Sequence, residues 1–337
     1  MSNPSTETVT DSASPGSPTA LICGVSGQDG AWLAEFLLQQ GYTVFGSSRD
    51  AQMASFGNLK TLGIFDRVQF CSMAHNDFRS VLQTLAQVEP DEVYNLAGQS
   101  SVGLSFQQPV ETLESIATGT LNLLEAVRFI GKPIRLYNAG SSECFGDLGE
   151  NGVADENTLF HPRSPYAVAK AAAYWEVANY REAYGLHACS GILFNHESEL
   201  RASRFVTKKI VSTAVRIAQG ADETLSLGNI DVWRDWGYAP EYMKGMWMML
   251  QHDVPGDFVL ATGRSHSLKE FVAGVFAELD LDWQEHVLIE EGFFRPSDIN
   301  YSRGDPEKAY AQLGWRAETA FHGLIRKLVV AETEAQA

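Results

Sequence analysis

Residues 22–33 read ICGVSGQDGAWL and place Gly24, Gly27 and Gly30 at three-residue intervals. An apolar run precedes them and a helical pattern follows, so they occupy a turn between a strand and a helix. A side chain there would block the tight turn, the approach of backbone to a pyrophosphate, and the packing of helix on sheet. Spaced glycines also occur in purely structural turns. At the start of an alternating strand and helix pattern, however, they predict a dinucleotide site with the phosphates at the helix N-terminus.

Short apolar runs alternate with longer helical runs from residue 20 to residue 194. The strand-like runs are 20–25, 42–47, 68–71, 92–97, 134–139 and 187–194, and the helical runs are 31–40, 78–88, 109–130 and 166–184. This alternation predicts an α/β fold with a doubly wound parallel sheet. After residue 195 it weakens. We expect a disordered tail at 1–19, a Rossmann domain with the cofactor and catalytic residues at 20–195, and a smaller, mainly substrate-binding α/β part at 196–337, some segments of which return to the Rossmann core.

The charge balance limits the partners of this chain. Its 337 residues include 25 Lys and Arg against 42 Asp and Glu, which gives a formal net charge of −17. Such a surface repels nucleic acid and anionic membranes, so we expect neither as a partner. A phosphate-containing ligand requires the few basic residues to be concentrated where it binds.

The N-terminus and the cysteines predict a cytoplasmic protein without a metal. The first 20 residues contain no Lys, no Arg and no apolar run, and no run of 18 apolar residues occurs anywhere. The cysteines stand alone in apolar segments, without a CxxC pair, which favours reduced, buried thiols. The sequence HESE at 196–199 lacks the second histidine of H-E-x-x-H, so no metal site is expected.

The end of the second strand distinguishes NAD from NADP. An acidic residue there binds the ribose 2′-hydroxyl, whereas an arginine accepts the 2′-phosphate. The sequence VFGSSRD places Ser48 and Arg49 before any acid. NADP is therefore the expected cofactor. Asp50 leaves two possibilities open, because its carboxylate either partly neutralises the pocket or turns outward to solvent.

Tyr166 and Lys170 form a Y-x-x-x-K pair on one face of a helical run. A nearby ammonium favours the phenolate and lowers the tyrosine pKa, which suits tyrosine to act as a base. The strand at 134–139 leads into Ser141, Ser142 and Glu143, at the sheet edge where doubly wound folds bind ligands. Glu143 provides a second base, able to remove a proton from carbon. The alternatives are a surface Tyr/Lys pair and a capping or solvated glutamate.

Most of the chain after residue 20 resembles the extended short-chain dehydrogenase/reductase superfamily and, within it, the GDP-mannose 4,6-dehydratase family. The matching stretches are GVSGQDGAWLAEFLLQQGY, NLAGQSSVGLSF, PRSPYAVAK, NYREAYG, GILFNHES, FVTKKI, RDWGYAPEYMKGMWMMLQ, ATGRSHSLKEF, FRPSD and GDPEKAYAQLGW. Among them, ILFNHES followed by FVTKKI and RDWG looks like this dehydratase and unlike the superfamily's reductases and epimerases.

The resemblance implies a lyase that converts GDP-mannose to GDP-4-keto-6-deoxymannose through bound NADP. It implies that Ser141 binds the sugar 4-hydroxyl, that Glu143 is the catalytic glutamate, and that Tyr166 and Lys170 relay the proton. The expected cofactor-binding residues are Gly24, Gly27, Gln28, Asp29, Gly30, Ser48, Arg49, Leu96, Ala97, Gln99, Tyr166 and Lys170. The expected substrate-binding residues are Ser101, Ser142, Asn195, Val206, Lys209, Arg234 and Arg295. The basic residues expected to gather around the diphosphate are Arg201, Arg204, Lys208, Lys209, Arg234 and Arg295.

The chain departs from the family pattern at several positions. Ser141 replaces a threonine, which keeps the hydroxyl and loses the methyl that restricts its rotamer. Ser72 and Met73 stand where an acidic residue is expected to read the adenine, and Glu199 and Leu200 replace a proline-containing turn.

The resemblance also implies an oligomer. Helices 109–130 and 164–184 would form a homodimer interface, because their apolar faces would be exposed in a monomer. The segment 51–59 differs from the family's serine-rich loop, which joins cofactor sites across a tetramer interface in relatives, so a homotetramer remains open.

Two other functions compete with the dehydratase. An NAD(P)-dependent reductase or epimerase of a nucleotide-linked keto sugar has no use for Glu143. A non-catalytic dinucleotide sensor would tolerate the loss of Tyr166 or Lys170, and both residues are present.

Overall fold

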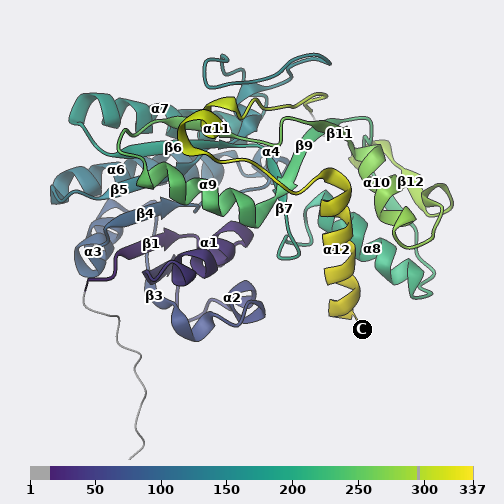
Figure 1. Ribbon diagram of the computed structural model, residues 1–337, viewed down its shortest axis with the longest axis horizontal. Coiled ribbons are helices and arrows are strands. Elements are labelled where there is room, and N and C mark those ends of the chain that lie inside the picture. The colour runs from purple at the N-terminus through teal and green to yellow at the C-terminus, as the bar shows by residue number, and fades with distance from the viewer. Residues whose placement is uncertain (1–15, 294–296, 337) are drawn as a thin grey trace, which may run out of the picture.

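A computed structural model describes residues 16–293 and 297–336 (Figure 1). Its central sheet consists of β1 (Thr19–Cys23), β2 (Thr43–Ser48), β3 (Gln69–Ser72), β4 (Glu92–Asn95), β5 (Arg135–Ala139), β6 (Ala188–Leu193) and β10 (Asp257–Leu260). The order across the sheet is β10-β6-β5-β4-β1-β2-β3, and all neighbouring strands are parallel. The predicted doubly wound α/β fold is confirmed.

Helices cover both faces of this sheet. One face carries α1 (Gln28–Gln39), α9 (Ala239–Gln251) and α11 (Glu307–Leu313), and the other carries α3 (Phe78–Val88), α6 (Gly119–Ile130) and α7 (Pro165–Tyr184). Leu33 and Met246 belong to the core of the first face, and Leu85 and Leu123 to that of the second. Because both faces are covered, β4 and β6 are buried along their whole length.

The chain leaves the sheet after β6 and later returns to it. Helix α9 contains the predicted apolar core helix at 242–250, and β10 pairs with β6 at the sheet edge. The Asp257 carboxylate fixes this edge, since it pairs with the Arg181 guanidinium at 2.5 Å and accepts the Ser190 backbone N–H at 3.1 Å.

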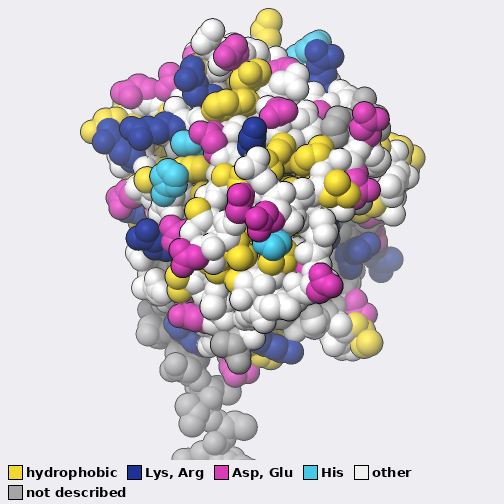
Figure 2. All heavy atoms as spheres, turned by 90° about the vertical axis from the view of Figure 1, so that its right-hand side faces the viewer, with side chains coloured by type: hydrophobic (Ala, Val, Ile, Leu, Met, Phe, Trp, Pro, Cys, Tyr) yellow, Lys and Arg dark blue, Asp and Glu magenta, His cyan; other side chains and the backbone are white. Residues whose placement is uncertain are grey.

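The smaller part contains two short sheets and three longer helices. Its sheets are β11 (Ser265–Ser267), β9 (Trp233–Tyr238) and β7 (Asn195–Glu197), and β12 (Val287–Ile289) with β8 (Leu225–Leu227). Helices α8 (Val206–Ala218), α10 (Leu268–Ala277) and α12 (Phe321–Gln336) surround a core that includes Phe271 and Leu324. Figure 2 shows this end of the molecule, where acidic, basic and apolar side chains are interspersed.

The helix expected at 109–130 is interrupted. Helix α5 (Pro109–Leu113) continues into a π-helical turn, η2 (Glu114–Thr118), before α6 begins. Within η2 the Ser115 hydroxyl accepts the backbone N–H of Gln99 at 3.2 Å. The widened turn therefore supports the segment after β4, and π-helical turns are frequent near functional sites.

The remaining short helices are α2 (Gly57–Thr61), α4 (Val102–Gln107), η1 (Phe65–Arg67), η3 (Ser142–Phe145), η4 (Trp283–Glu285) and η5 (Glu291–Phe293). Within the described ranges, no helix is long and apolar enough to cross a membrane. The tail expected at 1–19 falls mainly on residues 1–15, outside the described ranges, and Thr19 already belongs to β1.

Candidate active site

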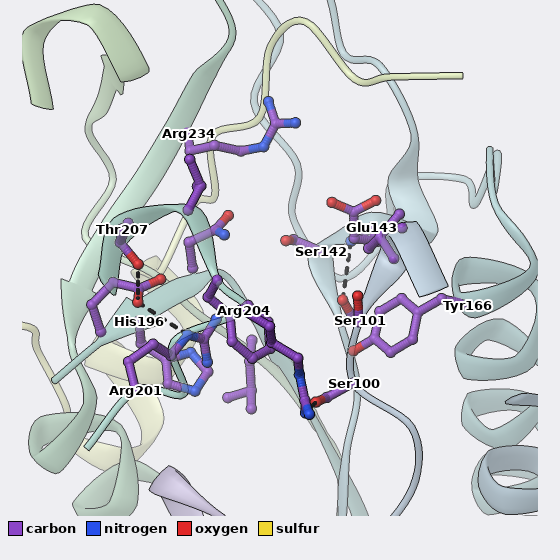
Figure 3. A pocket seen from close by; sticks show the side chains of 18 of the residues that line it. Ser100, Ser101, Ser142, Glu143, Tyr166, His196, Arg201, Arg204, Thr207 and Arg234 are labelled. Carbon is purple, nitrogen blue, oxygen red and sulfur yellow. Dashed lines mark hydrogen bonds and ion pairs between the residues drawn. The ribbon is translucent and has the colours of Figure 1, made fainter. Parts of the chain in front are cut away.

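A cavity of about 460 Å³ opens beyond the carboxyl ends of β4, β5 and β6, where the sheet meets the smaller part. In Figure 3, Ser142, Glu143 and Tyr166 lie on one side of this cavity. His196, Arg201, Thr207 and Arg234 lie on the opposite side, and Arg204 extends between the two sides toward Ser100. The sequence predicted a site at this edge of the sheet.

The glycine-rich turn after β1 forms a backbone cradle. Gly24 has φ +85°, in the left-handed region that favours glycine. A Cβ on Gly30 would lie 2.4 Å from the Gly24 carbonyl oxygen, so that side of the turn has no room for a side chain. Gly27 is the N-cap of α1 and has more space, since its Cβ would meet only the Gly24 oxygen at 3.5 Å. A bare turn at a helix N-terminus fits a dinucleotide pyrophosphate.

The predicted cofactor residues fall into two groups. Those that line the cavity are Asp29, Leu96, Ala97, Gln99, Tyr166 and Lys170. Those outside its lining, in the turn after β1, at the start of α1 or at the end of β2, are Gly24, Gly27, Gln28, Gly30, Ser48 and Arg49. The two groups are contiguous, because Gly24 packs against Ala97 with only 3.0 Å for a Cβ. An extended dinucleotide could span both.

The end of β2 carries the residues expected to distinguish NADP from NAD. The Arg49 side chain is 84% exposed and lies 3.9 Å from the Glu111 carboxylate of α5. Asp50 accepts the backbone N–H groups of Gln52 and Met53 at 3.0 and 3.1 Å, so its carboxylate is hydrogen-bonded within its own turn. No pattern in the sequence indicated Glu111, which lies 62 positions beyond Arg49.

The end of β3 has a structural role here. The Ser72 hydroxyl accepts the backbone N–H of Ala51 at 3.0 Å, and Met73 is buried in the core. These residues tie the turn after β2 to the sheet.

Ser141, Ser142 and Glu143 all line the cavity from the turn after β5. Ser141 is the N-cap of η3, and its hydroxyl accepts the Glu143 backbone N–H at 3.3 Å. The short helix holds the serine hydroxyl and the glutamate carboxylate in the same cavity.

Tyr166 and Lys170 line the cavity from α7. The Lys170 ammonium lies 5.9 Å from the centroid of the Tyr166 ring and donates a 2.7 Å hydrogen bond to the Ala139 carbonyl. Burial lowers the pKa of Lys170 to about 8. Burial raises the pKa of Tyr166 above its ordinary value, against a hydrogen bond from Ser141 and the charge of Arg201. The predicted lowering of the tyrosine pKa by Lys170 is therefore not found in this structure, because burial outweighs it.

The predicted substrate residues largely meet in this cavity. Those that line it are Ser101, Ser142, Asn195, Val206, Lys209 and Arg234. Arg295 lies outside the described residues. The Arg234 guanidinium donates to the Ile299 carbonyl at 2.7 Å and pairs with Asp298 at 3.2 Å, so these contacts hold it beside the cavity.

Arg201 and Arg204 also line the cavity, although the sequence indicated them only as members of a basic cluster. Arg201 stacks on Phe205 at 3.9 Å and pairs with Glu197 at 3.0 Å, and Glu197 accepts the Thr207 hydroxyl at 2.7 Å. Arg204 reaches Ser100 at 3.1 Å. Nothing in the sequence spacing indicated these partners.

Lys208 was wrongly expected in this cluster. Its ammonium pairs with Glu332 of α12 at 2.5 Å and donates to the Glu199 carbonyl at 3.0 Å. Lys208 and Lys209 are neighbours on α8, so their side chains point in different directions, and only Lys209 lines the cavity.

The family model described as GDP-mannose 4,6 dehydratase matches residues 21–328. The chain is 45% identical over 327 residues to "GDP-mannose 4,6 dehydratase 1" of Arabidopsis thaliana, covering 94% of this chain and 90% of the relative. It is 44% identical to the GDP-mannose 4,6-dehydratase of Sinorhizobium fredii, with 92% and 95% covered.

Among solved structures, the UDP-glucose 4-epimerase of Thermus thermophilus, in complex with NAD, has a TM-score of 0.82 and is 26% identical. The match covers 94% of this chain and 99% of the epimerase.

Proposed function

The chain belongs to the GDP-mannose 4,6-dehydratase family, and we propose that it converts GDP-mannose to GDP-4-keto-6-deoxymannose with loss of water. The observation that carries this proposal is the meeting of Glu143 with Ser141, Tyr166 and Lys170 in one cavity beside the glycine-rich turn. A reductase or epimerase of a nucleotide-linked sugar, the alternative, needs no carboxylate to remove a proton from C5.

The site supports an internal redox elimination. A bound nicotinamide would supply the redox chemistry, as acceptor of the C4 hydride and donor of hydride to C6. Ser141 holds the 4-oxygen while Tyr166 takes its proton. The resulting ketone acidifies the C5 hydrogen; Glu143 removes this proton and passes it to the C6 hydroxyl, which departs as water. C5 regains a proton, from Tyr166, as hydride reaches C6. Lys170 places a positive charge beside Tyr166, 5.9 Å from the centroid of its ring.

NADP is the proposed cofactor, with Ser48 and Arg49 for its 2′-phosphate. The exposed guanidinium of Arg49 and the hydrogen bonds that engage the Asp50 carboxylate within its own turn support this choice. A nicotinamide dinucleotide of either kind fits the backbone cradle and cavity lining, and the similar epimerase structure contains NAD. Gly24, Gly27, Gln28, Asp29, Gly30, Leu96, Ala97 and Gln99 are the proposed contacts to the rest of the cofactor.

The proposed substrate-binding residues are Ser101, Ser142, Asn195, Val206, Lys209, Arg234 and Arg295. Arg201 and Arg204 are added because they line the same cavity. Arginine and lysine there supply the local positive charge that a GDP diphosphate needs on a chain of net charge −17.

A homodimer is proposed through α5, η2, α6 and α7, with a homotetramer left open. The side chains of Val110 and Trp175 on α5 and α7 are 67% and 62% exposed, and Leu113 and Val168 are also exposed on these helices. A second copy would cover them. Residues 20–195 as cofactor domain and 196–337 as mainly substrate domain, and a cytoplasmic location with reduced cysteines, are likewise proposals.

The direct test is incubation of the purified protein with GDP-mannose and substoichiometric NADP. We expect a 4-keto product lighter by one water and many turnovers per NADP. Glu143→Gln should lower turnover by roughly 10²–10⁴, whereas Glu150→Gln, on an exposed loop, should not. A product of unchanged mass would instead support an epimerase, and a requirement for stoichiometric NADPH would support a reductase.

A further inference from the structure

Asp29 and His196 meet in the cavity wall although 167 positions separate them. Asp29 lies in the first turn of α1, directly after the glycine-rich turn, and His196 lies on β7, the first strand of the smaller part. His196 Nε2 and Asp29 Oδ2 are 2.9 Å apart.

The hydrogen-bond geometry limits the protonation states of this pair to two. His196 Nδ1 lies 2.7 Å from the Phe194 carbonyl oxygen, which can only accept, so Nδ1 carries a proton. Nε2 faces a carboxylate, which also accepts unless it is itself protonated. The ring must therefore be an imidazolium opposite an Asp29 carboxylate, or the pair must share the same proton.

The surroundings favour the ionised form. Burial disfavours the imidazolium, but the Asp29 carboxylate outweighs it and raises the pKa of His196. Burial likewise disfavours the carboxylate, and His196 outweighs it and lowers the pKa of Asp29. The other groups that face the pair are Arg201 after β7, Tyr242 of α9, Tyr137 of β5 and Lys170 of α7.

Further hydrogen bonds attach β7 to α1 at the same point. The Gln28 amide donates to Asp29 Oδ1 at 2.9 Å and to the His196 carbonyl at 3.3 Å. Ser198 donates to the Gln28 side-chain oxygen at 2.9 Å and accepts the Trp32 indole N–H at 3.1 Å. The His196 backbone and Ser198 are thus attached to α1 beside the histidine ring.

We propose that His196 is a positioning residue whose positive charge neutralises Asp29 at the N-terminus of α1, where the cofactor's phosphates bind. Strand β7 of the smaller part would thereby complete the dinucleotide site. The phosphates of a dinucleotide lie at the N-terminus of the first helix, where an uncompensated carboxylate would repel them. This inference rests on the nicotinamide cofactor of the proposed function.

The binding test uses NADP and calorimetry with the full chain at pH 7.5. His196→Gln should raise the NADP Kd about tenfold, equivalent to about 1.4 kcal/mol. In an Asp29→Asn background the same His196→Gln change should raise the Kd less than about threefold, because no carboxylate is left for the histidine to neutralise. His322→Gln, on the exposed surface of α12, is the matched control.

An equal loss of affinity from His196→Gln in the wild type and in the Asp29→Asn background would mean a structural role and overturn the inference. Unchanged affinity in His196→Gln would overturn it too. A wild type that binds neither NADP nor NAD would remove the cofactor from the proposed function as well. The proposals are separable, because cofactor binding is measured without GDP-mannose.

A second measurement needs no His196 variant to fold. Nitrogen-15 NMR of the histidine rings should find one ring whose pKa is raised in the wild type and is no longer raised in Asp29→Asn. If no histidine ring has a raised pKa, the charge pair does not exist.

Discussion

The ammonium of Lys170 donates a 2.7 Å hydrogen bond to the carbonyl of Ala139, the last residue of β5, two positions before Ser141. The same residue that faces Tyr166 is thereby anchored to the strand that leads into the catalytic turn. Its pKa is lowered from 10.5 to about 8, because burial disfavours the charge.

Activity should therefore fall as the pH rises through about 8, where Lys170 loses its charge. Lys170→Met should lower kcat by roughly 10²–10⁴, while Lys244→Met, exposed on α9, should not.

The pKa of Lys170 is lower in the folded protein than in the unfolded chain. Burying the charged ammonium therefore lowers the stability of the fold in full below about pH 8, and this loss disappears as the pH rises toward 10.5. We expect Lys170→Met to melt at or above the wild-type temperature at pH 7. An activity that stays constant up to pH 10 would contradict the role of the Lys170 charge in the reaction.

Glu143→Gln should separate oxidation from elimination. Tyr166 and Ser141 remain, so hydride transfer from C4 is still expected, but the C5 proton is not removed. Single-turnover absorbance should show reduced nicotinamide accumulating to at most one per site, and kcat should drop by roughly 10²–10⁴. Wild-type turnover in this variant would rule out the carboxylate as the base.

Alanine substitutions at two glycines of the same turn should have different effects, one on the stability of the fold and the other on NADP affinity. Gly30→Ala places a Cβ 2.4 Å from the Gly24 oxygen, so the backbone must shift; we expect a stability loss of about 1–3 kcal/mol in urea unfolding. Gly27→Ala has ordinary space, with 3.5 Å to its nearest neighbour, and should keep its stability while losing NADP affinity. Equal stability of the two variants would contradict the steric argument.

Arg49 and Glu111 should set the preference between NADP and NAD. Arg49→Ala should weaken NADP by about 1.5–3 kcal/mol, as expected for a lost hydrogen bond between charged groups, and leave NAD nearly unchanged. Glu111→Gln should tighten NADP by at most about 1 kcal/mol, because the pair is exposed and screened. Titrations of both cofactors measure these changes, and parallel shifts for NAD would show that neither residue reads the 2′-phosphate.

Trp175→Glu should dissociate the proposed dimer, since it places a charge on the exposed apolar face of α7. Val254→Glu, equally exposed on the turn between α9 and β10, is the control. Light scattering after gel filtration gives the mass. A wild-type monomer would reject the interface.

The sheet was predictable because each of its strands is marked by an apolar run of a few consecutive residues. The helix expected at 78–88 has the bounds of α3, and strand ends at Ser48, Asn95 and Ala139 lie within two residues of the expected ones. The π-helical turn in 109–130 was missed, since one widened turn leaves the apolar pattern almost unchanged.

The lining of the cavity was predictable where its residues lie in a short motif, as at Ser141, Glu143, Tyr166 and Lys170. It was not predictable where partners come from distant segments. Lys208 pairs with Glu332, 124 positions away, and His196 pairs with Asp29, 167 positions away. Adjacent residues on a helix, such as Lys208 and Lys209, look alike in a sequence, although only Lys209 lines the cavity.

Strand β10 has a consequence for modularity. It pairs with β6, and its Asp257 holds Arg181 of α7, although it comes after most of the smaller part in the chain. A fragment cut at residue 195 would therefore expose the β6 edge and lose α9 from one face of the sheet. The central sheet and its helices therefore cannot be transplanted as one continuous segment. A chimera with a relative has to exchange the chain up to β6 together with α9, β10 and α11.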